Sequence, residues 1–256
     1  MNERGMRQSH AAAEMTLFFC AFFLPGYIAQ TAMASAGPVT SSLLLQSIVT
    51  GIPQFLLMAY VAGVTGPASA PRWGFVRLES RDGLRIVSLV LACFAVAAPF
   101  IGLAIALPSR WTSALAMGYR WGLRSASQLP LALLFGLTAG YREEFFFRSY
   151  LLGRLDEIGI PVPYAAAGST ALFCLGHLYE GPLGIAIVAA LGALFCVVYI
   201  RRRNLHVVAI SHGAYNALVL CLSLVFPRPL PASACMHVFF TASAYGFTYP
   251  ASLLYH

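Results

Sequence analysis

Long apolar runs alternate with short polar segments along the whole chain. About 20 consecutive apolar residues are enough for one helix to cross a bilayer. The pattern therefore predicts an all-α, polytopic integral membrane helix bundle with about eight transmembrane helices. The predicted spans are residues 15–36, 39–64, 86–107, 129–155, 161–179, from the break at 181–182 to 200, 205–226 and 232–255.

The polar segments between these runs differ in character. Residues 66–85 form a polar loop with four arginines, and residues 110–127 combine tryptophan, tyrosine and arginine, which is typical of a segment at the membrane interface. Positively charged loop residues favour the cytoplasmic side of a membrane. Ten arginines fall on the side of the two termini and four on the other side, which predicts cytoplasmic termini.

The composition agrees with a single membrane domain over residues 1–256. Hydrophobic residues make up 59% of the chain and charged residues 10%, against about 25% charged residues in a soluble domain. The net charge of +7 does not indicate nucleic-acid binding, because the arginines are scattered between apolar spans. All basic side chains are arginine, and alanine and glycine are abundant, which suggests a GC-rich genome. We expect the protein in a bacterial inner (plasma) membrane.

One predicted span contains a strongly charged stretch, residues 141–148, with the sequence YREEFFFR. A charge in the hydrocarbon core costs about 2.5–3.5 kcal/mol on insertion scales, so such residues mark a functional site. Glu144 and Arg148 are four residues apart and share one helix face, which also fits a structural ion pair between helices. This ion pair does not account for Glu143. Two adjacent carboxylates cannot both ionise cheaply in a low dielectric, and this is the condition for a general base or acid.

Two later spans carry the other strong polar groups. Phe173 and His177 lie four residues apart in the span 161–179, and His212 and Asn216 have the same spacing in the span 205–226. A lone histidine in an apolar helix is more often structural, and hydrogen bonding between helices accounts equally well for His212 and Asn216. Together, however, the motifs place these groups in three helices that are able to converge.

The three motifs in this order resemble those of the CPBP family, the CAAX-protease and bacteriocin-processing intramembrane peptidases, also called the Abi family. The resemblance covers residues 128–226, which we take as the catalytic core. The chain matches every position of the three motifs, which are Glu143-Glu144…Arg148, Phe173…His177 and His212…Asn216.

The resemblance implies an intramembrane endopeptidase that needs no cofactor. It implies that Glu143 activates a water molecule with the help of His177, and that His212 and Asn216 donate hydrogen bonds to the tetrahedral oxyanion. The ion-paired carboxylate and arginine of the first motif would hold the site and receive the substrate. The implied partners are the lipid bilayer and a membrane-associated protein, or a lipidated or C-terminal peptide.

Other hypotheses remain open from the sequence. Two glutamates and two histidines are able to bind zinc, although the helical His-Glu-x-x-His signature is absent and a neighbouring arginine disfavours a dication. Intramembrane carboxylates and histidines also occur in proton-coupled transporters, but the chain shows no repeated half. A non-catalytic immunity protein is the third alternative. The substrate itself cannot be read from the sequence.

Overall fold

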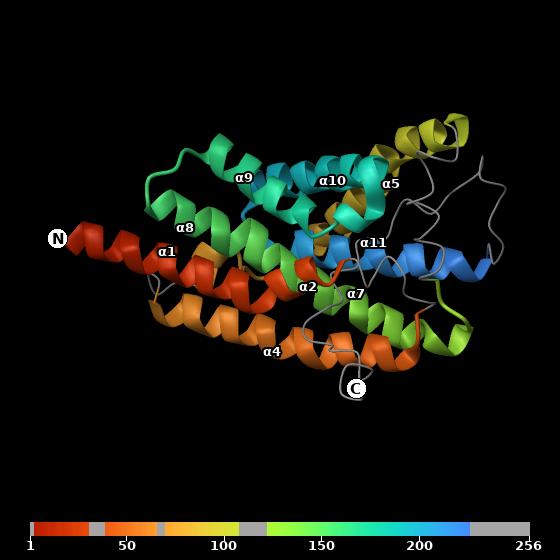
Figure 1. Cartoon of the computed structure of the whole chain (residues 1–256), viewed down its shortest axis with the longest axis horizontal. Helices are drawn as coiled ribbons and strands as arrows, with labels where there is room; N and C mark the ends of the chain where they lie inside the picture. Colours follow the sequence, from red (N-terminus) through yellow and green to blue (C-terminus); the bar gives the residue numbers. More distant parts are fainter. Residues whose placement is uncertain (1–2, 31–38, 66–69, 108–121, 226–256) are drawn as a thin grey trace, which may run out of the picture.

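The computed structural model describes residues 3–30, 39–65, 70–107 and 122–225, and every regular element in these ranges is a helix. Figure 1 shows most of the long helices running along the long axis of the molecule. The helices are α1 (Glu3–Phe22), α2 (Leu24–Ile28), α4 (Ser41–Thr65), α5 (Ser80–Ala106), α7 (Leu129–Glu143), α8 (Leu151–Glu157), α9 (Val162–Leu175), α10 (Gly181–Arg202) and α11 (Leu205–Val225), together with the π-helix η3 (Glu144–Tyr150) and the short 3₁₀ helices η1 (Ala70–Trp73), η2 (Ala126–Gln128) and η4 (Leu178–Glu180).

Four helices in the described part of the chain are long and apolar enough to cross a membrane. They correspond to four of the predicted spans and confirm an all-helical chain with several membrane-spanning helices. The total of eight spans is not confirmed, because α9 is a shorter apolar helix and the predicted span 232–255 lies outside the described residues. The four helices cover Ser41–Thr65, Ser80–Ala104, Leu178–Arg202 and Leu205–Leu224.

Several boundaries differ from the prediction for local reasons. The first helix begins at Glu3 rather than Met15 and ends at Phe22, just before α2, which has a proline in its first turn. Proline lacks a backbone N–H and suits a helix start. Helix α5 begins at Ser80 rather than at residue 86, because Glu79 and Asp82 form a capping box there. The polar segment 66–85 is therefore partly helical.

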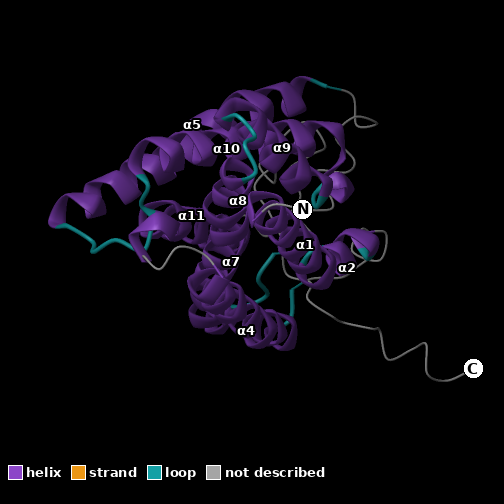
Figure 2. Ribbon diagram, turned by 90° about the vertical axis from the view of Figure 1, so that its left-hand side faces the viewer, coloured by secondary structure: helices purple, strands orange, loops and turns teal. Residues whose placement is uncertain are grey.

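The helices surround the π-helix η3. Helices α4, α7, α11 and α5 form a row in which each helix packs against the next, and α10 and α9 continue from α5. Figure 2 shows this arrangement end-on, with α1 beside α8 and α2 next to α1. The π-helix contacts α4, α9, α10 and α11 and buries all seven of its residues.

Small residues bring α7 and α11 into backbone contact. A Cβ atom added to Gly136 or Gly140 on α7 would overlap backbone atoms of Gly213 and Ala209 on α11. Gly136 and Gly140 form a GxxxG pattern, which allows two membrane helices to approach closely. The pair α7–α11 has the most extensive contact between elements, and it places the end of α7 against the middle of α11.

A polar network ties α1 to the end of the charged helix. The Tyr150 hydroxyl donates to Oε1 of Glu14 at 2.5 Å, and Nη2 of Arg154 lies 2.7 Å from the same oxygen. Arg154 is 4% exposed, and its other amino group donates to Glu157 at 2.9 Å. The network fixes which face of α8 turns toward α1.

Candidate active site

The two adjacent carboxylates lie where an α-helix becomes a π-helix. Glu143 is the last residue of α7 and Glu144 is the first residue of η3. The backbone N–H of Leu151 donates to the carbonyl of Phe146, a bond that spans five residues as in a π-helix. Short π-helical turns are frequent at functional sites. Both glutamates are 0% exposed, so the turn presents two carboxylates to the interior of the bundle.

Glu144 is held by two partners on one oxygen. Nη1 of Arg148 donates to Oε1 of Glu144 at 3.0 Å, which confirms the predicted ion pair. Nδ1 of His212 lies 2.7 Å from the same oxygen. Arg148 is itself positioned by Gly192, whose carbonyl accepts from Nη2 at 3.4 Å, and by the ring of Phe173, 4.2 Å below its guanidinium carbon. Glu144 thus joins η3 to α11.

Glu143 has a different environment. No described residue donates a hydrogen bond to either of its carboxylate oxygens. Its charged neighbours are Nε2 of His212 at 3.9 Å and Nη2 of Arg142 at 3.7 Å. Arg142 also donates to Oε1 of Gln54 on α4 at 3.1 Å. A buried carboxylate with free oxygens beside two nitrogen groups is able to accept a proton from a bound water.

His212 lies between the two carboxylates. Its Nδ1 atom contacts Glu144, and its Nε2 atom faces Glu143. The ring stacks on Phe195, with ring centroids 5.1 Å apart and an interplanar angle of 21°. Asn216 follows one turn later on α11 and is 1% exposed. The spacing of four residues therefore places both side chains in the buried interior, as predicted.

His177 lies in a turn and not inside a spanning helix, which corrects the predicted extent of the span 161–179. Helix α9 ends at Leu175, and His177 precedes the short helix η4. Nδ1 of His177 donates to the carbonyl of Phe173 at 2.8 Å, since a carbonyl can only accept. Its Nε2 atom has no hydrogen-bond partner among the described residues. The centroid of the Phe173 ring is 4.7 Å from that of His177 and 6.2 Å from that of His212, so both imidazoles flank one ring.

The N-terminal helices also support the site, and the sequence reasoning missed this. The Tyr27 hydroxyl donates to the carbonyl of Leu172 at 2.7 Å. The Gln30 amide donates to the carbonyl of Leu175 at 2.7 Å and accepts from the backbone N–H of Tyr179 at 3.0 Å. These bonds satisfy carbonyls that the end of α9 leaves without helical partners. The only signal in the sequence was two polar side chains in a predicted span.

The described side chains include no group of three or more His, Cys, Asp or Glu arranged to hold a metal ion. Each of the two candidate histidines has one ring nitrogen in contact with a protein group. One nitrogen of His212 contacts Glu144, and one nitrogen of His177 donates to a backbone carbonyl. Independence from a metal remains a prediction, which a chelator tests directly.

Comparison with known proteins identifies the segment that carries these groups. Residues 125–218 match a family model described as type II CAAX prenyl endopeptidase Rce1-like, which is a peptidase family. No curated protein and no solved structure matches the chain. The matched segment contains all three motifs and nearly coincides with the predicted core, residues 128–226. The match over residues 125–218 thus agrees with the family that the three motifs resemble.

Proposed function

We propose that the protein is an intramembrane endopeptidase that hydrolyses a peptide bond of a membrane-associated protein or peptide with a water molecule activated by Glu143. One observation carries the proposal. Glu143 is fully buried, has no hydrogen bond to its oxygens from any described residue, and faces Nε2 of His212 at 3.9 Å, inside the segment that matches an endopeptidase family. Its environment suits a general base.

The first step is attack of water on the scissile carbonyl. Glu143 takes one proton from the water while the water oxygen forms a bond to the carbonyl carbon, and the carbonyl π electrons move to the oxygen. His177 supports this step through Nε2, which is free of protein partners among the described residues. General base catalysis of this type contributes about 10²–10⁴-fold to the rate.

The tetrahedral intermediate needs hydrogen-bond donors for its new negative charge. Nδ1 of His212 donates to Glu144, so Nε2, which faces Glu143, donates to the oxyanion when the ring carries a proton on both nitrogens. Asn216 supplies an amide from the next turn of the same helix. Donors fixed in a buried site stabilise an oxyanion strongly, because they need no reorganisation during the reaction. Collapse of the intermediate breaks the C–N bond, and the proton held by Glu143 passes to the leaving amine.

Glu144 and Arg148 hold the site in this proposal. Their ion pair has 0% exposure on both sides, and it fixes one nitrogen of His212. The substrate class is C-terminal or CAAX-type processing of a membrane-associated chain, in keeping with the name of the matching family. The protein acts within the membrane, since four helices of the described chain are able to span it.

The test is cleavage by the purified full chain in detergent, with a panel of fluorogenic peptides, some of which carry a lipidated C-terminal cysteine. Glu143→Gln is the control, and each assay is run with and without a strong zinc chelator. Cleavage that survives the chelator and disappears in Glu143→Gln supports a glutamate peptidase. Cleavage that the chelator abolishes and zinc restores supports the zinc-dependent alternative. Cleavage unchanged in Glu143→Gln contradicts the proposed base.

A further inference from the structure

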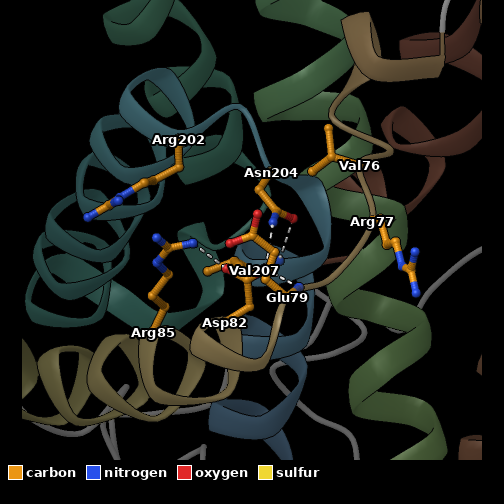
Figure 3. A pocket seen from close by; sticks show the side chains of 8 residues that line it. All are labelled: Val76, Arg77, Glu79, Asp82, Arg85, Arg202, Asn204 and Val207. Carbon is orange, nitrogen blue, oxygen red and sulfur yellow. Dashed lines mark hydrogen bonds and ion pairs between the residues drawn. The ribbon is translucent and has the colours of Figure 1, made fainter.

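A polar cavity of about 180 Å³ lies where α10 ends and α5 and α11 begin, and its lining includes none of the candidate active-site residues. It is formed by the segment before α5, the first turns of α5, the end of α10 and the start of α11. Figure 3 shows charged side chains from these elements around one space. The polar lining consists of Arg77, Glu79, Asp82, Arg85, Arg202 and Asn204.

The two carboxylates of the cavity are already neutralised by protein groups. Asp82 accepts from the backbone N–H of Glu79 at 2.8 Å, from Nη1 of Arg85 at 2.6 Å and from Nδ2 of Asn204 at 3.4 Å. Glu79 pairs with Nε of Arg81 at 2.9 Å. Asp82 and Glu79 thus compensate two arginines and leave the others uncompensated.

An excess of positive charge therefore surrounds the cavity. Arg77 and Arg202 are exposed, and neither makes an ion pair or hydrogen bond with a described residue. Arg201 lies in the last turn of α10 and Arg203 is the C-cap residue of the same helix, where its backbone N–H donates to the carbonyl of Tyr199 at 2.7 Å and its guanidinium lies 5.9 Å from the Tyr199 ring. In Figure 3 Arg85 and Arg202 extend to the same side of the cavity. Arg85 bonds Asp82 through Nη1 alone, so its other nitrogen atoms remain available.

The cavity lies at the depth where spanning helices leave the membrane. The candidate spans Ser80–Ala104 and Leu205–Leu224 begin at it, and the candidate span Leu178–Arg202 ends at it. The polar headgroup layer flanks the hydrocarbon core at this level. Basic pockets between spanning helices bind anionic headgroups, and arginine forms paired hydrogen bonds with phosphate oxygens.

We propose that this cavity binds the phosphate of an anionic phospholipid headgroup. The amino groups of Arg202 and Arg85 hold the phosphate oxygens, and Arg77 adds positive charge at the rim. The first turns of α5 and α11 contribute Asp82 and Val207 to the lining of the same cavity, so the positive ends of both helix dipoles lie beside it. The site is separate from the peptidase site, and its occupancy does not depend on the proposed reaction.

The test is the unfolding midpoint of the purified full chain in a zwitterionic detergent, titrated with short-chain phosphatidylglycerol, phosphatidylcholine or inorganic phosphate. We expect phosphatidylglycerol to raise the midpoint saturably and phosphatidylcholine to leave it unchanged. In the double variant Arg77→Gln/Arg202→Gln we expect the apparent affinity for phosphatidylglycerol to fall about thirtyfold. Each arginine near the headgroup layer contributes about 1 kcal/mol, and the loss of two corresponds to this factor. Native mass spectrometry of the same samples counts retained lipid.

Arg202→Gln is compared with Arg124→Gln, which removes the same charge from an exposed position. Arg124 lies at the far end of α11, because its neighbour Leu123 bonds Ser223 at 2.8 Å, whereas Arg202 lies beside the start of α11. Loss of lipid stabilisation in Arg202→Gln alone, with an unchanged midpoint in the absence of lipid, supports the site. Equal loss in both variants means a diffuse charge effect and overturns it. An equal rise with inorganic phosphate overturns the lipid as the source of the anion.

Discussion

Nδ1 of His212 lies 2.7 Å from Oε1 of Glu144, although the two residues are 68 positions apart. The contact joins α11 to the π-helix and sets the direction of the whole imidazole ring. It leaves Nε2 toward Glu143 at 3.9 Å. One carboxylate therefore orients the ring, and the other faces its second nitrogen.

Removal of His212 should mainly affect the chemical step. We expect His212→Ala to lower kcat by about 10²–10³-fold with little change in KM, because the ring would stabilise the oxyanion more than the bound substrate. Asn216→Ala should have an effect of the same kind. Steady-state kinetics with a cleaved peptide measures both variants. A change confined to KM would contradict the assignment of these side chains as oxyanion donors.

Removal of only one partner of the Glu144–Arg148 ion pair should strongly destabilise the protein. Both side chains are 0% exposed. Loss of one buried partner leaves an uncompensated charge and costs about 3–5 kcal/mol. We expect Glu144→Gln to lower the free energy of unfolding by this amount. The double variant Glu144→Gln/Arg148→Met should recover part of the loss, because it also removes the stranded cation.

Denaturant titration of the detergent-solubilised chain measures these variants and gives the coupling energy of a double-mutant cycle. A double variant as unstable as the sum of the two single variants would show that the pair does not couple. In that case the contact at 3.0 Å contributes little to stability.

The Tyr27 hydroxyl should matter for the position of His177. Tyr27→Phe removes its bond to the Leu172 carbonyl and keeps the ring that packs against Gly176. We expect kcat to fall about tenfold, and stability to fall by only about 1 kcal/mol, typical of one hydrogen bond. Tyr164→Phe is the matched control, because Tyr164 is 73% exposed. A drop in stability without a drop in kcat would mean that Tyr27 only supports the fold.

Because α7 and α11 pack closely, replacement of glycine by alanine should affect stability differently at this contact and elsewhere. A Cβ atom on Gly140 would overlap the backbone of Ala209, whereas a Cβ atom on Gly168 in α9 meets nothing within 4 Å. We expect Gly140→Ala to cost about 1–3 kcal/mol through overpacking. Gly168→Ala should be neutral or stabilise the helix by up to about 1 kcal/mol. The measurement is the unfolding midpoint of Gly140→Ala and of Gly168→Ala. Equal midpoints would argue against the close contact between α7 and α11.

Local patterns in the sequence predicted the parts of the site that lie on one helix. The spacing of Glu144 and Arg148 was sufficient to predict their ion pair, because four residues complete about one helical turn. The apolar runs likewise predicted α4, α5, α10 and α11 with useful accuracy. The start of α5 was placed too late, because hydropathy does not detect the capping box formed by Glu79 and Asp82.

Contacts between distant segments were not accessible in this way. Nothing in the pattern relates Tyr27 or Gln30 to the end of α9, 145 positions away. His177 was placed inside a span because its neighbours are apolar, but the helix ends at Leu175 and backbone bonds then form a turn. The GxxxG pattern at Gly136 and Gly140 was readable and would have predicted a close helix contact on this face of α7, although not that α11 makes it.

The π-helix also limits which changes of chain length this protein tolerates. Its wider turn takes up one residue more than an α-helix, and one residue corresponds to about 100° of helical rotation. Deletion of one residue from this turn would therefore restore an α-helix and leave α8 close to its present rotation, whereas deletion of one residue from the regular part of α7 would turn α8 by about 100°, so that Tyr150 and Arg154 no longer face Glu14. Point substitutions keep this phase, whereas gain or loss of a single residue in the regular α-helix before the turn would disconnect the two halves of the helix from their separate neighbours.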